Sequence, residues 1–250
     1  MRYFADIEFD GTAYCGWQIQ PQSPSVQQTL EEAFALFLRR KVEVTGAGRT
    51  DAGVHAAQMI AHFDLEEPQD PDWMLHKLNG ILPPDIAVHS IYPVRPDAHA
   101  RFDAVARTYK YYVTLYKSAF FRGYSWYLVN EPDFNLMNDA AEILLSTVDF
   151  TSFSKLHTDT KTNDCHVTKA EWEKLPDGRR VFTITADRFL RNMVRAIVGT
   201  LMDVGRHKLT VDEFKKITEC RDRCCAGDSA PAQGLFLHKI EYPDDIYLKG

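Results

Sequence analysis

The run GAGRTDAGVHA at Gly46–Ala56 lies between an alternating segment, Lys41–Val44, and an apolar segment, Gln58–Phe63. Both flanks are typical of strands, so the run is predicted to be a loop that joins two strands. Its three glycines permit left-handed backbone and close approach of a ligand. The loop carries Arg49 and Asp51, and a carboxylate on a firm scaffold that is open on one side suits catalysis.

Two other interpretations of this loop stay open on pattern alone. A Thr-Asp-Ala-Gly tetrapeptide is often a simple turn in which the aspartate caps backbone N–H groups. A phosphate-cradling loop is less favoured, because the spacing matches neither the dinucleotide-binding nor the P-loop pattern and no helix-forming run follows.

Five motifs in order resemble the TruA family of tRNA pseudouridine synthases, and they span nearly the whole chain. They are FDGTAYCGWQ at Phe9–Gln18, RTDAGVHA at Arg49–Ala56, RTYKY at Arg107–Tyr111, FLRNMVR at Phe189–Arg195 and APAQGL at Ala230–Leu235. The resemblance implies an enzyme that acts on tRNA as a homodimer.

Length and composition are compatible with this. A chain of 250 residues with 45% hydrophobic residues can form one large domain or two modest ones. No apolar run approaches the roughly 18 residues that a membrane span needs. The N-terminus has no signal-peptide core, so we expect a soluble cytoplasmic protein with no membrane partner.

The net charge of −6 argues against a surface that coats nucleic acid generally. Its distribution is uneven, with seven basic and three acidic residues from Asp177 to Lys208, and six acidic and one basic from Asp64 to Asp85. Such clusters are commonly just solvated faces. The charge pattern therefore permits RNA binding without establishing it.

The periodicity predicts two repeats of the order strand, helix, strand, strand, helix, strand. In the first repeat we expect strands at Arg2–Phe9, Lys41–Thr45, Ala56–Leu65 and Asp85–Val94, with helices from the Ser25 cap to Arg39 and over Trp73–Ile81. In the second we expect strands at Ala106–Tyr116, His166–Leu175, Arg180–Ala186 and Leu235–Tyr242, helices at Leu136–Leu145 and Phe189–Val204, a polar loop at Asp149–Asp164 and an extra helix capped by Thr210.

This order predicts an α+β fold of two ferredoxin-like (RRM-like) units, residues 1–100 and 101–250. The resemblance implies the same architecture, the pseudouridine synthase fold, in which the two units are fused through a mostly antiparallel sheet. A cleft between the units would be a natural site.

The five cysteines are odd in number and lack the spacing of a disulfide framework. Cys220, Cys224 and Cys225, with Cys165 and His166 as distant partners, fit no common structural zinc pattern. Reduced thiols in a cytosolic protein are the favoured interpretation.

The resemblance assigns the catalytic carboxylate to Asp51 and its partner guanidinium to Arg195. An arginine within a few ångströms lowers the pKa of an aspartate and so keeps it ionised. Arg191 and Arg195 are four residues apart and are expected on one face of the predicted helix, where Arg191 could meet phosphates. A solvent-facing arginine pair is the commoner reading of such spacing.

Tyr109 is the expected stacking residue. Alternation puts Tyr109 and Tyr111 on one face of their strand and Lys110 and Tyr112 on the other, and interleaved aromatic and basic residues can stack on unpaired RNA bases. An ordinary aromatic sheet face is the alternative. By resemblance Tyr109 packs on the target uracil, and Tyr111 belongs to the core.

The resemblance gives three further assignments. Arg49 takes the place of the nucleotide that leaves the helix, and Leu235 forms an apolar wall of the uracil pocket. The segment with Cys15 and Trp17 lies near the tRNA, and His55 is a scaffold or RNA-contact residue. No cofactor or metal is expected, because the isomerisation needs no redox step or energy input.

The resulting hypothesis is an isomerase that converts uridine to pseudouridine at positions 38, 39 and 40 of the tRNA anticodon stem-loop. Two rivals remain at this stage: a non-catalytic RNA-binding protein on the same fold, and an aspartate-dependent glycosidase that releases free uracil.

Overall fold

The computed structural model describes residues 1–155 and 162–248, and the chain forms two compact units. The first unit is built from Met1–Ala106 together with the chain end from Leu237, and the second is the continuous segment Arg107–Phe236. The first unit therefore combines both ends of the chain. The expected class is confirmed, an α+β fold whose strands are largely antiparallel.

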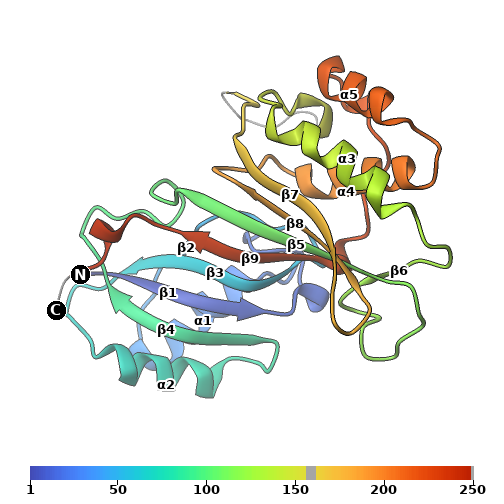
Figure 1. Cartoon of the computed structure of the whole chain (residues 1–250). Helices are drawn as coiled ribbons and strands as arrows, with labels where there is room; N and C mark the ends of the chain where they lie inside the picture. Colours follow the sequence, from blue (N-terminus) through green and yellow to red (C-terminus); the bar gives the residue numbers. More distant parts are fainter. Residues whose placement is uncertain (156–161, 249–250) are drawn as a thin grey trace. The chain divides into compact units, whose positions relative to one another are not determined.

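Within Met1–Ala106 the first unit has the predicted element order, and its strands and helices lie close to the expected positions. Its elements are β1 (Arg2–Phe9), α1 (Val26–Leu38), β2 (Thr45–Gly46), β3 (His55–Asp64), α2 (Pro71–Ile81), β4 (Ile86–Pro93) and most of β9 (Leu235–Glu241). β1 lies between β4 and β3 and pairs antiparallel with both, and β9 follows β3 in the sheet. Figure 1 shows these strands side by side, with α2 next to β4.

Helix α1 begins where the sequence predicts. The Ser25 hydroxyl accepts the backbone N–H of Gln28, which satisfies one of the unpaired N–H groups at the helix start. The apolar side chains of Val26, Leu30 and Phe34 are buried along one face of the helix. The helix ends at Leu38, and Arg39 adopts the left-handed conformation typical of a helix terminus.

The strand predicted at Lys41–Thr45 is wrong in extent, because only Thr45 and Gly46 pair with β3. Val42 and Val44 are buried, as the alternation predicts. The backbone of Val44, however, is bound by side chains of α1 instead of a neighbouring strand. Its N–H donates to Glu31 at 3.0 Å and its carbonyl accepts from Gln27 at 2.9 Å.

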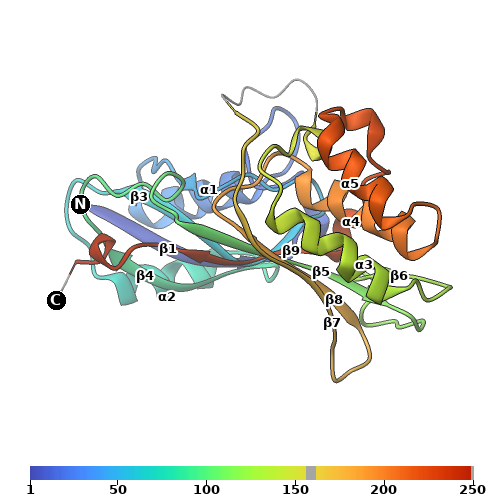
Figure 2. The same ribbon diagram turned by 45° about the horizontal axis from the view of Figure 1, so that its top comes forward.

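The second unit follows the predicted order except at two places. The last strand, expected at Leu235–Tyr242, lies mostly in the first unit, and a short strand at Trp126–Tyr127 was not predicted. Its elements are β5 (Ala106–Thr114), β6 (Trp126–Tyr127), α3 (Phe134–Glu142), β7 (Val167–Lys174), β8 (Arg180–Ala186), α4 (Met193–Gly205) and α5 (Val211–Cys220). β8 pairs antiparallel with both β5 and β7. Helices α3, α4 and α5 lie together in Figure 2. Of the predicted polar loop at 149–164, residues 156–161 lie outside the described residues.

Helix α5 begins at the predicted capping box. The Thr210 hydroxyl accepts the N–H of Glu213, and the Glu213 carboxylate accepts the N–H of Thr210 at 2.8 Å. Two N–H groups at the start of the helix are thus satisfied reciprocally.

Candidate active site

Asp51 lies in the loop between β2 and β3, in the first unit. The N–H of Val54 donates to the Asp51 carbonyl at 3.2 Å, which closes a tight turn. Gly53 has a φ of 75°, a conformation that favours glycine at this turn position. Asp51 is half-exposed and Arg49 is exposed. The turn interpretation is therefore correct for the backbone, and it leaves the Asp51 carboxylate partly open to a ligand.

Two glycines of the Phe9–Gln18 motif let that segment pack directly against the Asp51 loop. A Cβ at Gly11 would come within 2.0 Å of the Val54 carbonyl oxygen. A Cβ at Gly16, whose φ is 93°, would come within 2.1 Å of the Thr50 carbonyl oxygen. No larger residue fits either position without moving the loop, so the first motif is a scaffold for the second.

Hydrogen bonds fix the same two segments together. The N–H of Trp17 donates to the Thr50 hydroxyl at 3.0 Å, and the N–H of Gly53 donates to the Tyr14 carbonyl at 3.3 Å. Trp17 is only 1% exposed, so its indole is not available to stack on a nucleotide. Trp17 therefore has a structural role, and the expectation that its segment lies near the tRNA stays a prediction.

His55 belongs to this scaffold as well. Its side chain is buried, and its Nδ1 lies 3.0 Å from the Asp10 carboxylate and 3.1 Å from the Gly11 backbone nitrogen. Of the two roles expected for His55, the contacts of the buried ring support the scaffold role.

Tyr109 and Tyr111 lie on β5 in the second unit. Tyr111 is fully buried, its hydroxyl donates to the Pro231 carbonyl at 2.8 Å, and burial raises its pKa above the ordinary value. Its assignment to the core is confirmed. Tyr109 is half-buried, and its ring meets that of Phe189 edge-on at 5.0 Å between centroids. Tyr109 therefore has a fixed edge contact while part of its surface remains accessible.

Arg195 lies in the first turn of α4 and is held by Ala230. Its Nε donates to the Ala230 carbonyl at 2.7 Å, and the Ala230 N–H donates to the Arg195 carbonyl at 2.9 Å. Gly199 permits this approach, because a Cβ there would lie 1.7 Å from the Asp228 carbonyl oxygen. One hydrogen bond from the guanidinium and one to the backbone carbonyl thus tie Arg195 to Ala230.

The prediction that Arg191 and Arg195 share a helix face is wrong. α4 begins at Met193, and Asn192 before it has a left-handed backbone with a φ of 65°. The Asn192 amide donates to the Ser229 hydroxyl at 2.6 Å, which stabilises this break. Arg191 is therefore an exposed residue ahead of the helix, and its carbonyl accepts the N–H of Lys155 at 3.1 Å.

Leu235 is buried and follows Gly234 at the start of β9. A Cβ at Gly234 would come within 2.7 Å of the Tyr111 ring, so the backbone of the last motif packs flat on that ring. The segment from Ala230 to Leu235 thus contacts both Tyr111 and Arg195. The residue types of the motif at Ala230–Leu235 do not indicate that Ala230 binds Arg195.

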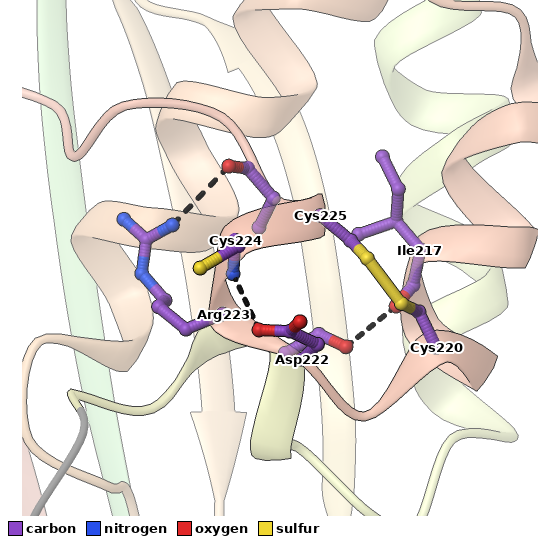
Figure 3. The surroundings of a disulfide bond; sticks show 8 residues. Ile217, Cys220, Asp222, Arg223, Cys224 and Cys225 are labelled. Carbon is purple, nitrogen blue, oxygen red and sulfur yellow. Dashed lines mark hydrogen bonds between the residues drawn. A yellow bond between two sulfur atoms is a disulfide. The ribbon is translucent and has the colours of Figure 1, made fainter.

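The expectation of free thiols is wrong for Cys220 and Cys225, which form a disulfide (Figure 3). α5 ends at Cys220, and Arg221 adopts the left-handed conformation that turns the chain back. Asp222 then accepts the N–H of Cys224 at 2.9 Å and caps a short turn that returns Cys225 to the helix end. Cys224 is exposed and free.

Within residues 1–155 and 162–248, no group of three or more His, Cys, Asp or Glu side chains is arranged to hold a metal ion. None of the helices described is long and apolar enough to cross a membrane.

Comparison with known proteins gives one consistent family. The family model described as tRNA pseudouridine synthase matches residues 5–103 and 140–243. A protein of Bacteroides thetaiotaomicron named tRNA pseudouridine synthase A is 60% identical over 98% of this chain and 92% of its own length. Proteins of the same name from Porphyromonas gingivalis and Bacillus subtilis are 53% and 38% identical, over 99% and 97% of this chain and 99% of their own lengths. Matches of this extent leave no large segment of the chain unaccounted for, and the chain therefore belongs to the tRNA pseudouridine synthase family.

Proposed function

We propose that this chain isomerises uridine to pseudouridine in tRNA, at positions 38, 39 and 40 of the anticodon stem-loop. The observation that carries the proposal is Asp51, a half-exposed carboxylate on a loop clamped by the Phe9–Gln18 motif. The family match covers both segments, and the relatives at 53% and 60% identity carry the name of this activity.

The reaction breaks the N1–C1′ glycosidic bond and joins C1′ to C5 of the same uracil. C5 loses its proton and N1 ends with one, so the composition of the RNA does not change. Asp51 can attack C6 of the base, attack C1′ or remove a sugar proton. Each of these roles requires an ionised carboxylate, and a neighbouring guanidinium favours that form.

We assign Arg195 as the partner of Asp51. Its hydrogen bond to Ala230 supports this, because a guanidinium with one N–H group fixed keeps its other donors in a defined plane. We assign Tyr109 to stacking on the uracil and Leu235 to the apolar wall of the pocket. Arg49 takes up the space of the extruded nucleotide, and Arg191 contacts phosphate. Extraction of the base is needed because the reacting atoms are not reachable within the stack.

The resemblance further implies a homodimer, and the tRNA substrate implies the cytoplasm. The homodimer is tested by light scattering of the purified protein with and without tRNA. A monomer in both conditions would contradict it.

The activity is tested by release of tritium from tRNA transcribed with uridine labelled at C5. We expect release by the wild-type protein and a loss of at least about 10³-fold in Asp51→Asn, since removal of a covalent or general-base catalyst has effects of this order. Asp51→Asn should still bind tRNA.

The same assay separates the rivals. A non-catalytic RNA-binding protein would bind the tRNA without releasing tritium. A glycosidase would produce free uracil and an abasic RNA, which chromatography detects. Mapping of pseudouridine by mass spectrometry, before and after deletion of the gene, tests the assignment to positions 38–40.

A further inference from the structure

A small hollow lies beside the Asp51 loop within the first unit. Arg49 and Arg101 both line it, although 52 positions separate them in sequence. The other polar side chains that line it are uncharged, namely those of Trp17, Gln18, Gln27 and Thr45. No carboxylate belongs to the lining. Two cations with neutral hydrogen-bonding groups form an environment that attracts an anion.

The wall of this hollow is rigidly built. The Gln27 amide donates to the Val44 carbonyl at 2.9 Å, and its oxygen accepts from the Gln18 amide at 3.0 Å. Gly46 lies directly on the buried Trp17 indole, since a Cβ there would come within 2.5 Å of the ring. The hollow therefore exists before any ligand binds, which reduces the entropy lost on binding.

Arg101 is placed by a chain of rings that starts in the sheet. His62 is a buried residue of β3, and its Nδ1 accepts the N–H of Ala100 at 3.2 Å. The His99 ring meets the His62 ring edge-on at 4.6 Å, and the Phe102 ring follows at 4.2 Å from His99.

Two further contacts bind Arg101 to this chain of rings. Its N–H donates to His99 Nδ1 at 3.1 Å, and its guanidinium lies 5.7 Å from the centre of the Phe102 ring. The turn that carries Arg101 is thus anchored to β3 through His62, while Arg101 itself is exposed.

We propose that Arg101 binds a backbone phosphate of the tRNA next to the target uridine, that Arg49 adds positive charge to the same hollow while it fills the space of the extruded nucleotide, and that His62 positions Arg101. This inference rests on the proposed function, since it names a subsite for the same substrate. A phosphate is the expected ligand because the planar Arg101 guanidinium can donate two parallel hydrogen bonds to it, and the nearby charge of Arg49 favours an anion. The position next to the target follows from Arg49, which is two residues from Asp51.

The subsite is tested by the salt dependence of tRNA binding in the Asp51→Asn background, where the substrate is not consumed. We expect Arg101→Ala to weaken binding by about tenfold, as expected for loss of a charged hydrogen bond. The slope of log K against log salt should fall by about 0.7 to 0.9, the effect of one phosphate contact. Arg101→Lys should recover the slope but only part of the affinity.

The matched control is Lys77→Ala, which removes an exposed cation on α2 of the same unit. It should leave both affinity and slope unchanged. An unchanged slope in Arg101→Ala, or an equal fall in Lys77→Ala, would overturn the phosphate subsite. The failure of the proposed function is a separate result, because it would appear as absence of tritium release by the otherwise unaltered protein.

The positioning role of His62 is tested by a double-mutant cycle. His62→Leu removes the acceptor for the Ala100 N–H and should lower the slope as Arg101→Ala does, whereas His62→Asn keeps an acceptor and should retain it. In the otherwise unaltered enzyme, His62→Leu should raise KM and leave kcat nearly unchanged. The double variant should bind no more weakly than Arg101→Ala alone, because both changes act on one contact. If the losses in tRNA-binding free energy were additive, His62 would act independently of Arg101 and would have only a structural role.

Discussion

The backbone N–H of Trp17 donates a hydrogen bond to the hydroxyl of Thr50, which immediately precedes Asp51. This bond joins the first motif of the chain to the Asp51 loop through a hydroxyl group that a single substitution can remove. A displacement of about 1 Å far from the reacting atoms can reduce a rate by roughly 10²-fold. The hydroxyl is therefore expected to contribute to catalysis by holding Asp51 in place.

Thr50→Val replaces that hydroxyl with a methyl group of similar size. We expect a loss of about 1 kcal/mol in the free energy of unfolding, the usual contribution of one hydrogen bond, with a larger effect on kcat than on tRNA affinity. Urea unfolding and tritium release measure the two effects. Thr50→Ser keeps the hydroxyl and should keep most of the activity. Equal losses in both variants would exclude the hydroxyl as the reason.

Gly16→Ala tests the close approach of the two segments. The added methyl would meet the Thr50 carbonyl oxygen, and the φ of 93° is unfavourable for any side chain. We expect destabilisation by about 2 to 4 kcal/mol, in the range of overpacking combined with backbone strain.

The matched control is Gly80→Ala on α2, where no atom lies within 4 Å of the new methyl. It should stabilise the protein by about 0.5 to 1 kcal/mol through helix propensity. Thermal unfolding should therefore move in opposite directions for the two substitutions. A shift in the same direction would contradict the packing argument.

Tyr109 and Tyr111 offer a comparison on one strand. If Tyr109 acts by stacking, Tyr109→Phe should keep kcat/KM within about tenfold, whereas Tyr109→Ala should lose roughly 10²-fold, since stacking on one base contributes about 1 to 3 kcal/mol. Tyr111→Phe should instead cost about 1 kcal/mol of stability with little change in rate, because it removes only the bond to Pro231. A Tyr109→Phe variant as inactive as Tyr109→Ala would point to proton transfer by the hydroxyl.

The Cys220–Cys225 bond closes a short loop behind α5. On the chain-entropy model a loop of this length stabilises the folded state by about 2 kcal/mol. Reduction, or replacement of both cysteines by serine, should lower the free energy of unfolding by this amount without changing tritium release. Thiol titration without a reducing agent, completed in denaturant so that buried cysteines also react, should find three free thiols in place of five. Five thiols would show that the bond does not form.

The sequence predicted the elements well where periodicity and caps act locally. The Ser25 and Thr210 caps depend only on neighbouring residues, and both lie where they were expected. The sequence did not predict local structure that depends on a contact with a residue distant in the chain. Val44 is bound by α1 side chains, and Asn192 is held left-handed by Ser229, so neither the short β2 nor the late start of α4 could be predicted.

The candidate site shows the same division. The types and order of the motifs assign Asp51, Tyr109 and Arg195 to the site through resemblance, and these assignments stay predictions. The supporting contacts could not be predicted in this way, because they join residues that are remote in the chain. Ala230 binds Arg195 through its backbone carbonyl, which carries no signal in the residue type, and the Thr50 hydroxyl accepts from the backbone N–H of Trp17, a partner that the sequence does not indicate.

His62 should make stability depend on pH. Burial, with Arg2 and His99 nearby, lowers its pKa from 6.5 to about 4, against the opposing effect of Asp64 and Asp103. Between these two values the unfolded chain binds a proton that the folded protein does not, so stability is full above pH 6.5 and falls as the pH drops towards 4. Protonation would also remove the acceptor for the Ala100 N–H.

The free energy of unfolding should therefore fall by about 2 kcal/mol between pH 7.5 and pH 5, because each pH unit below 6.5 costs about 1.36 kcal/mol. Urea unfolding of the wild-type protein and of His62→Asn at both pH values isolates this contribution, because other titrating groups, including His99, act in both proteins. The difference in unfolding free energy, wild type minus variant, should decrease by about this amount at pH 5. An unchanged difference would mean that His62 titrates equally in the folded and unfolded chains, and its burial would then not govern the acid sensitivity of the Arg101 turn.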